Sequence, residues 1–93
     1  MNHCIIVKWN DKTDKKAVIG PLGELFSGAK TIPGVSDVRL IENCVDLPNR
    51  YDLMIRITID KDKLSEWNGS EIHLRWKESY KDMILSKAIF DYE

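Results

Sequence analysis

The segment His3–Trp9 (HCIIVKW) is apolar on both faces of the strand that it is expected to form. The alternation of a β-strand places Ile5 and Val7 on one face with His3 and Trp9, and places Cys4 and Ile6 on the other face with Lys8. An antiparallel strand with one solvated face alternates between apolar and polar residues, and this segment does not. The fold must therefore cover this strand on both sides.

Further periodic segments follow the first strand. We expect a helix from Asp14 to about Lys30 with a kink near Gly20, a short helical turn within residues 61–70, and a helix from Ser70 to about Leu85. Strands are expected over Val35–Asn43, Tyr51–Ile59 and Lys87–Tyr92. The order β-α-β-β-α-β predicts one α+β domain over residues 1–93, with a ferredoxin-like, four-stranded antiparallel sheet and both helices on one face.

This architecture leaves one face of the sheet without a cover. Two helices can lie on only one side, yet the first strand is apolar on both sides, and Ile89 is opposite Phe90 in the last strand. A second copy of the same sheet is the simplest cover, since closed two-fold symmetry is the commonest arrangement of oligomers. The sequence therefore predicts a homodimer in which two sheets form an α/β barrel.

The composition argues against several classes of function. The chain has 14 Lys and Arg against 15 Asp and Glu, so no basic excess favours nucleic acid. No apolar run approaches the roughly 20 residues that span a bilayer. Cys4 and Cys44 match no zinc spacing and fit reduced thiols in a cytoplasmic protein, with Cys4 a buried, inert thiol. We expect no metal and no cofactor.

His73 begins a helical series with Trp76, Tyr80 and Ile84, at offsets of three, seven and eleven residues. This spacing places the four residues on one apolar and aromatic helix face, so the imidazole should point inward. Burial would then tend to lower its pKa. Two interpretations are open: a core histidine bonded to a backbone carbonyl or to Tyr80, or a site residue beside a cavity.

His3 shares its strand face with Ile5 and Val7. If this face meets the helices, both histidines look into one space between sheet and helices, where they would form a small-molecule pocket with a possible acid/base pair. If the strand is turned over, His3 faces the partner subunit instead. The tryptophans Trp67 and Trp76 fit either the wall of such a hollow or the core.

Four features together resemble the stress-responsive α/β-barrel (Dabb) family. They are His3 leading an apolar strand, RYDLMIRI (residues 50–57), the His73–Trp76 run, and the closing KAIFDYE (residues 87–93). The resemblance covers essentially the whole chain and implies a ferredoxin-like subunit whose sheet joins that of a second subunit in a barrel. It also implies a pocket for a small hydrophobic molecule, with His3, Ile5, Val7, Trp67, His73 and Trp76 as ligand-binding residues.

The resemblance leaves three functions open. Many Dabb proteins have no defined role, and a dimeric ligand-binding protein of this kind is the first expectation. One branch resembles polyketide cyclases, in which a histidine matching His73 is the base, a tyrosine matching Trp67 assists, and a histidine matching His3 lines the pocket. Here Trp67 departs from that pattern, because an indole can donate but cannot act as a phenol does. A heme-handling or monooxygenase-like protein is the third alternative.

Overall fold

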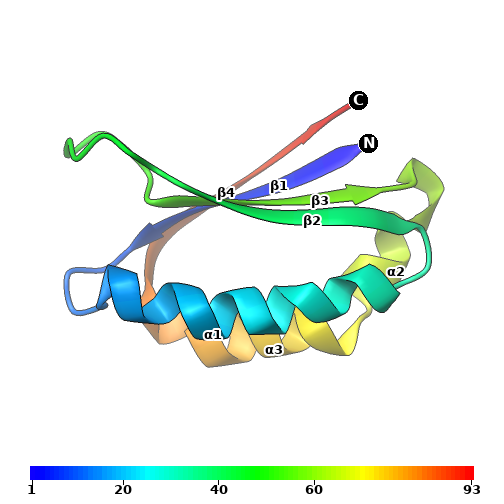
Figure 1. The fold of residues 1–93 in the computed structure, drawn as a ribbon, viewed down its shortest axis with the longest axis horizontal. Coiled ribbons are helices and arrows are strands. Elements are labelled where there is room, and N and C mark those ends of the chain that lie inside the picture. The colour runs from blue at the N-terminus through cyan, green and yellow to red at the C-terminus, as the bar shows by residue number, and fades with distance from the viewer.

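The chain folds into a sheet on one side and a helical layer on the other. The computed structural model describes all of residues 1–93, and Figure 1 shows the two layers. The strands are β1 (Asn2–Trp9), β2 (Val35–Glu42), β3 (Leu53–Ile59) and β4 (Ile84–Tyr92), and the helices are α1 (Lys15–Ser27), α2 (Leu64–Asn68) and α3 (Glu71–Tyr80). Short 3₁₀ turns lie at Gly28–Thr31, Lys61–Lys63 and Lys81–Met83.

The four strands lie in the order β2-β3-β1-β4, and each neighbouring pair is antiparallel. The two central strands are therefore β1 and β3, and only these two strands contain fully buried residues. This arrangement confirms the predicted ferredoxin-like fold, with α2 as a short helix beside the two longer ones.

The core fills the space between the sheet and the helices. Ile5, Val7 and Trp9 of β1 belong to one cluster of 15 buried residues, together with the odd-numbered residues of β3 and the apolar face of α1. His3 alternates with these residues and is also buried. The face of β1 that carries His3 therefore meets the helices, which decides between the two orientations that the sequence left open.

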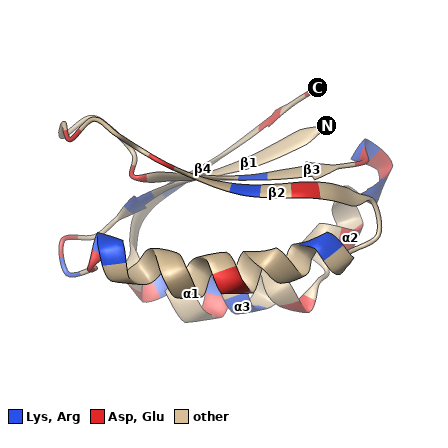
Figure 2. Cartoon of the chain, viewed as in Figure 1, with Lys and Arg blue, Asp and Glu red and all other residues tan.

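The other face of the sheet has no helix over it (Figure 1). Register places Cys4 between Arg56 of β3 and Phe90 of β4, and places Ile6 between Met54 and Ala88, so these side chains share the open face. Large apolar side chains remain exposed there: Phe90 is 61% exposed, and Ile41 and Tyr92 are each 42% exposed. Figure 2 shows acidic and basic residues interspersed over the strands, helices and loops.

Helix α1 begins directly after its capping residue Asp14, as predicted, but ends at Ser27, before the predicted end near Lys30. Asp14 caps its first turn by accepting hydrogen bonds from the backbone N–H groups of Lys16 and Ala17, each at 3.1 Å. The helix continues through Pro21 and ends at Ser27, with a 3₁₀ turn in place of the predicted helical residues up to Lys30.

None of the helices has the length and apolar character needed to cross a membrane.

The prediction that the last helix continues to about Leu85 is wrong. Helix α3 ends at Tyr80, and β4 begins at Ile84. The Asn10 amide side chain donates a hydrogen bond to the carbonyl of Asp82 at 2.7 Å, and the Asn10 backbone N–H donates to the carbonyl of Met83 at 2.8 Å. These long-range bonds take the carbonyls out of the helix, and Ile84 then pairs with Trp9 in the sheet.

Candidate functional site

His73 lies in the first turn of α3, directly after the junction with α2. Its backbone N–H donates a hydrogen bond to Oγ of Ser70, the residue that caps the helix, at 3.1 Å. Its Nδ1 lies 2.9 Å from the carbonyl oxygen of Asn68. A carbonyl can only accept, so Nδ1 carries the hydrogen, and the neutral ring has its lone pair on Nε2. The protein offers Nε2 no hydrogen-bond partner, which leaves this nitrogen available to a ligand.

The surroundings of His73 favour its neutral form. Partial burial lowers the pKa of His73 below its ordinary value of 6.5, and the positive charges of Lys77, Lys87 and His3 lower the pKa further. The hydrogen bond to Asn68 acts in the opposite direction and does not reverse the shift. At neutral pH this side chain is therefore a base rather than a cation.

Trp67 of α2 lies beside the His73 ring, with the two ring centroids 5.1 Å apart. Its side chain is fully buried, and it also packs on Phe26 of α1 at a centroid distance of 5.7 Å. The indole Nε1 is buried without a hydrogen-bond partner. A buried donor of this kind is costly unless a water or ligand satisfies it. The Trp67 ring beside His73 thus carries a hydrogen-bond donor that no protein group satisfies.

His3 and Asp91 form a second polar pair on the inner face of the sheet. Register places them directly opposite each other on β1 and β4, and Asp91 Oδ1 lies 2.5 Å from His3 Nδ1. The side chain of His3 is 8% exposed and that of Asp91 is 39% exposed. Figure 1 shows that both chain termini, and hence the ends of β1 and β4 that carry this pair, lie at the α2 end of the molecule.

The other predicted ligand-binding residues lie in the packed core. Ile5, Val7, Trp67 and Trp76 are each at most 2% exposed. None of the five best-defined hollows is lined by His3, Ile5, Val7 or Trp67. Ile5, Val7, Trp67 and Trp76 are thus part of the packed core between the sheet and the helices.

Two hollows open beside His73 instead. One of about 390 Å³ is formed by the α2–α3 junction and includes His73, Leu74 and Lys77 in its lining. The other, of about 480 Å³, lies between α3 and β4 and includes Leu74, Trp76, Lys77, Ile84 and Lys87. Leu74 and Lys77 border both hollows. The polar hollow at His73 thus adjoins, across Leu74 and Lys77, a groove that is lined by apolar side chains and several lysines.

Sequence reasoning missed Asp91, Asn68, Lys77 and Lys87 as neighbours of the two histidines. Asn68 and Lys77 are close to His73 in the sequence, and helical spacing of four residues could have indicated Lys77. Asp91 and Lys87 are reached only through strand pairing. Their register with β1 depends on the whole sheet, so no local signal identified them.

Cys4 is a buried, unreactive thiol. Its thiol is 1% exposed, and burial raises the pKa of Cys4, an effect that the nearby Arg56 charge opposes without reversing it. A thiol with a raised pKa is protonated at neutral pH and is a poor nucleophile. No three His, Cys, Asp or Glu side chains lie close enough together to hold a metal ion.

Comparisons with known proteins identify relatives in fold. No family model and no curated protein sequence matches the chain. A dimeric ferredoxin-like protein of unknown function from Thermobifida fusca superposes with a TM-score of 0.82 at 15% identity, over 98% of this chain and 87% of that one. A Dabb family protein with a ferredoxin-like fold from Mesorhizobium loti gives a TM-score of 0.66 at 12% identity, over 99% and 93% of the two chains.

A third similar structure is the hydroxynitrile lyase from Passiflora edulis, with a TM-score of 0.77 at 9% identity, over 98% of this chain and 89% of that one. At such identities the likeness concerns the fold. The chain has the ferredoxin-like fold that is found in a Dabb family protein, in dimeric proteins of unknown function and in this lyase.

Proposed function

We propose that this chain is a Dabb-type protein that forms a homodimer through the open face of its sheet. Exposed Phe90, Tyr92 and Ile41 on that face support a cover by a second sheet. Arg56 adds a further argument. Its Nε is buried on the same face without a hydrogen-bond partner in its own chain, and a second subunit would bring an acceptor to it. The structural relatives from Thermobifida fusca and Bacteroides fragilis are described as dimeric. A cytoplasmic location, inferred from the cysteine pattern, and a role in stress responses, inferred from the family resemblance, remain predictions.

We propose further that each subunit binds a small, largely apolar molecule at His73. The observation that carries it is the free Nε2 of His73, which the Nδ1–H bond to Asn68 holds in a defined orientation at the wall of a hollow. The polar end of the molecule would meet Nε2, and its apolar body would lie along Leu74 in the groove between α3 and β4. Hollows of several hundred Å³ have the usual size of small-ligand sites.

Native mass spectrometry of protein purified from its own source tests ligand binding. We expect a small molecule to accompany the wild-type protein and to be lost from His73→Gln, which keeps a hydrogen-bonding side chain but cannot accept a proton at neutral pH. The control is Glu24→Gln, which removes an exposed charge on α1 that borders neither hollow, and it should retain the molecule. A bare wild-type protein, or equal retention by His73→Gln, would contradict binding at His73.

A second candidate function is proton abstraction next to a carbonyl, as in a polyketide cyclase or lyase. The lowered pKa of His73 favours it, because a base must be unprotonated at neutral pH. The neighbouring Lys77 and Lys87 are suitably charged to stabilise an enolate. The hydroxynitrile lyase from Passiflora edulis is an enzyme of the same fold.

The variant Trp67→Tyr tests this second function, because it introduces the phenol of the cyclase pattern beside His73. We expect it to create or raise aldol-type activity on a linear polyketide, measured by product formation. The double variant Trp67→Tyr/His73→Gln should lack that activity. A Trp67→Tyr protein that binds the polyketide and remains inert would contradict the catalytic function and leave the binding function standing.

A further inference from the structure

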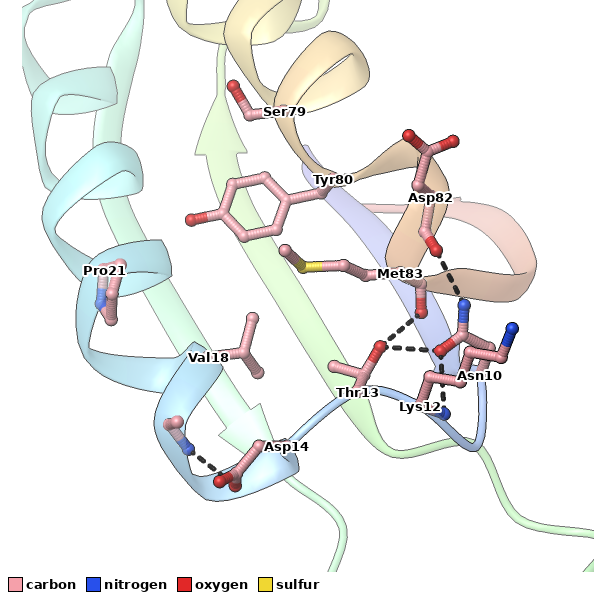
Figure 3. A pocket seen from close by; sticks show the side chains of 11 residues that line it. Asn10, Lys12, Thr13, Asp14, Val18, Pro21, Ser79, Tyr80, Asp82 and Met83 are labelled. Atoms are coloured by element: carbon pink, nitrogen blue, oxygen red, sulfur yellow. Dashed lines mark hydrogen bonds between the residues drawn. The ribbon is translucent and has the colours of Figure 1, made fainter.

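A third hollow of about 460 Å³ lies at the other end of the helical layer from His73. It opens between the start of α1 and the end of α3, as Figure 3 shows from close by. Seven residues along α3 separate His73 from Tyr80, a rise of about 10 Å. Trp76 lies between them on the same helix face and is 1% exposed, so it separates this hollow from the proposed site at His73.

The interior of this hollow is apolar. The side chains of Tyr80 and Met83 project toward α1, and Val18 and Pro21 border the hollow from the α1 side (Figure 3). Tyr80 is held in place by aromatic neighbours, with ring centroids 5.4 Å from Trp76 and 6.4 Å from Trp9. The hollow therefore has a fixed aromatic wall on which a ring can pack.

Two hydrogen-bonding groups at this hollow lack their usual partners. The Tyr80 hydroxyl points toward the turn of α1 that carries Pro21 (Figure 3), makes no hydrogen bond within the protein, and is accessible although the residue as a whole is 9% exposed. Burial raises the pKa of Tyr80, so this hydroxyl keeps its hydrogen at neutral pH. Pro21 has no N–H, so the Ala17 carbonyl lacks the donor that a helix normally supplies four residues later.

Hydrogen bonds hold together the wall of the hollow opposite α1, and two of the three charged residues that line the hollow are acidic. Thr13 Oγ1 lies 2.8 Å from Asn10 Oδ1 and 3.0 Å from the carbonyl oxygen of Met83, which ties the loop before α1 to the start of β4. Asp14 and Asp82 border the hollow, and neither has a basic group within 4.0 Å. Lys12 lies beside Asn10, on the side of the hollow away from α1 (Figure 3). Such a rim disfavours anions.

We propose that this hollow is a second binding site, for a compact neutral molecule with an apolar ring and an amide or hydroxyl group. The ring would pack between Tyr80, Met83 and Val18. Its polar group would accept a hydrogen bond from Tyr80 and donate one to the Ala17 carbonyl. The site lies in the helical layer, so it stays open when two sheets pair through their open faces.

Benzamide is a suitable probe, because it carries a ring, a hydrogen-bond acceptor and a donor. In a ¹H–¹⁵N NMR titration of the full chain we expect its shifts to centre on Val18, Ser79 and Met83, and not on His73. Toluene lacks the polar group and benzoate carries a negative charge, so both should bind more weakly. Equal binding of all three probes, or shifts centred on another part of the chain, would overturn the proposal.

Two variants sharpen the test. Tyr80→Phe keeps the ring and should weaken benzamide about two- to tenfold, the effect of one net hydrogen bond. Tyr92→Phe on the open sheet face is its control and should change nothing. Ala17→Leu places a larger side chain at the hollow and should abolish binding, whereas Lys16→Leu, one residue away on the exposed helix surface, should preserve it. Unchanged binding in both Tyr80→Phe and Ala17→Leu would refute the site.

Discussion

Burial is the largest influence on the pKa of His73 and lowers it, the hydrogen bond to Asn68 partly opposes this shift, and the charges of Lys77 and Lys87 lower the pKa further. Replacing Lys87 by Met removes one of the positive charges that lower the pKa of His73, so this pKa should rise toward its ordinary value. The measurement is an NMR titration of the His73 ring proton. Lys81→Met is the matched control, since Lys81 borders the same groove but is not among the charges that shift His73. An equal rise in both variants would contradict a specific effect of Lys87.

The same lowered pKa links His73 to stability. The unfolded chain binds a proton at about pH 6.5, whereas the folded chain binds it only at lower pH, so the unfolding free energy should fall as the pH drops from about 7 through the folded pKa. Urea unfolding of the wild type and of His73→Gln over this range measures the difference. The wild type should lose more stability than the variant, and parallel curves would argue against a lowered pKa.

At the scale of elements, two glycines occupy opposite environments. Gly34, in the turn before β2, has a φ of +88°, and a Cβ there would lie 2.6 Å from Cβ of Lys63. Gly34→Ala should therefore cost more than about 1 kcal/mol, through both strain and the clash. Gly23 lies inside α1 with nothing within 4 Å of such a Cβ, so Gly23→Ala should stabilise by about 0.5–1 kcal/mol.

Thermal or urea unfolding of the two alanine variants measures both effects. The opposite signs are the informative result, because the two substitutions add the same methyl group. A stabilised Gly34→Ala would contradict the turn conformation, and a strongly destabilised Gly23→Ala would indicate that the surface of α1 is covered by something else, such as a partner.

At the scale of the whole molecule, the open sheet face is the surface through which we propose that two copies pair. Ile6 lies at its centre between Met54 and Ala88. Sedimentation equilibrium at micromolar concentration should give twice the 10.8 kDa chain mass. Ile6→Lys should weaken the dimer at least about tenfold, because burying an unpaired charge costs more than the roughly 1.4 kcal/mol that a tenfold change requires.

Leu74→Lys is the control for Ile6→Lys. Leu74 is an equally apolar residue, 53% exposed on α3, and it lies in the helical layer away from the open sheet face. This variant should remain dimeric. A wild-type chain that stays monomeric at high concentration, or an Ile6→Lys variant with unchanged mass, would contradict pairing through the sheet.

The sequence by itself determined the features that arise within one element. Alternation in Leu53–Ile59 and around Ile5 identified the central strands, Asp14 and Ser70 were expected near the helix starts that they cap, and the element order predicted the fold. Strand and helix periodicity are local, so a short window carries them. The helical offset to Trp76 also placed His73 on the face of α3 that meets Trp67, although the structure leaves His73 half-buried at the edge of the core.

Only the tertiary structure decided what His3 and His73 touch and where α3 ends. Asp91 meets His3 through the register of β1 with β4, and Asn10 ends α3 by bonding to Asp82 and Met83 some seventy residues later. The same packing filled the expected pocket with Trp67 and its core neighbours and left hollows at the two ends of α3. These contacts join segments that are far apart in the chain, and their geometry depends on the packing of the whole domain, which no local pattern encodes.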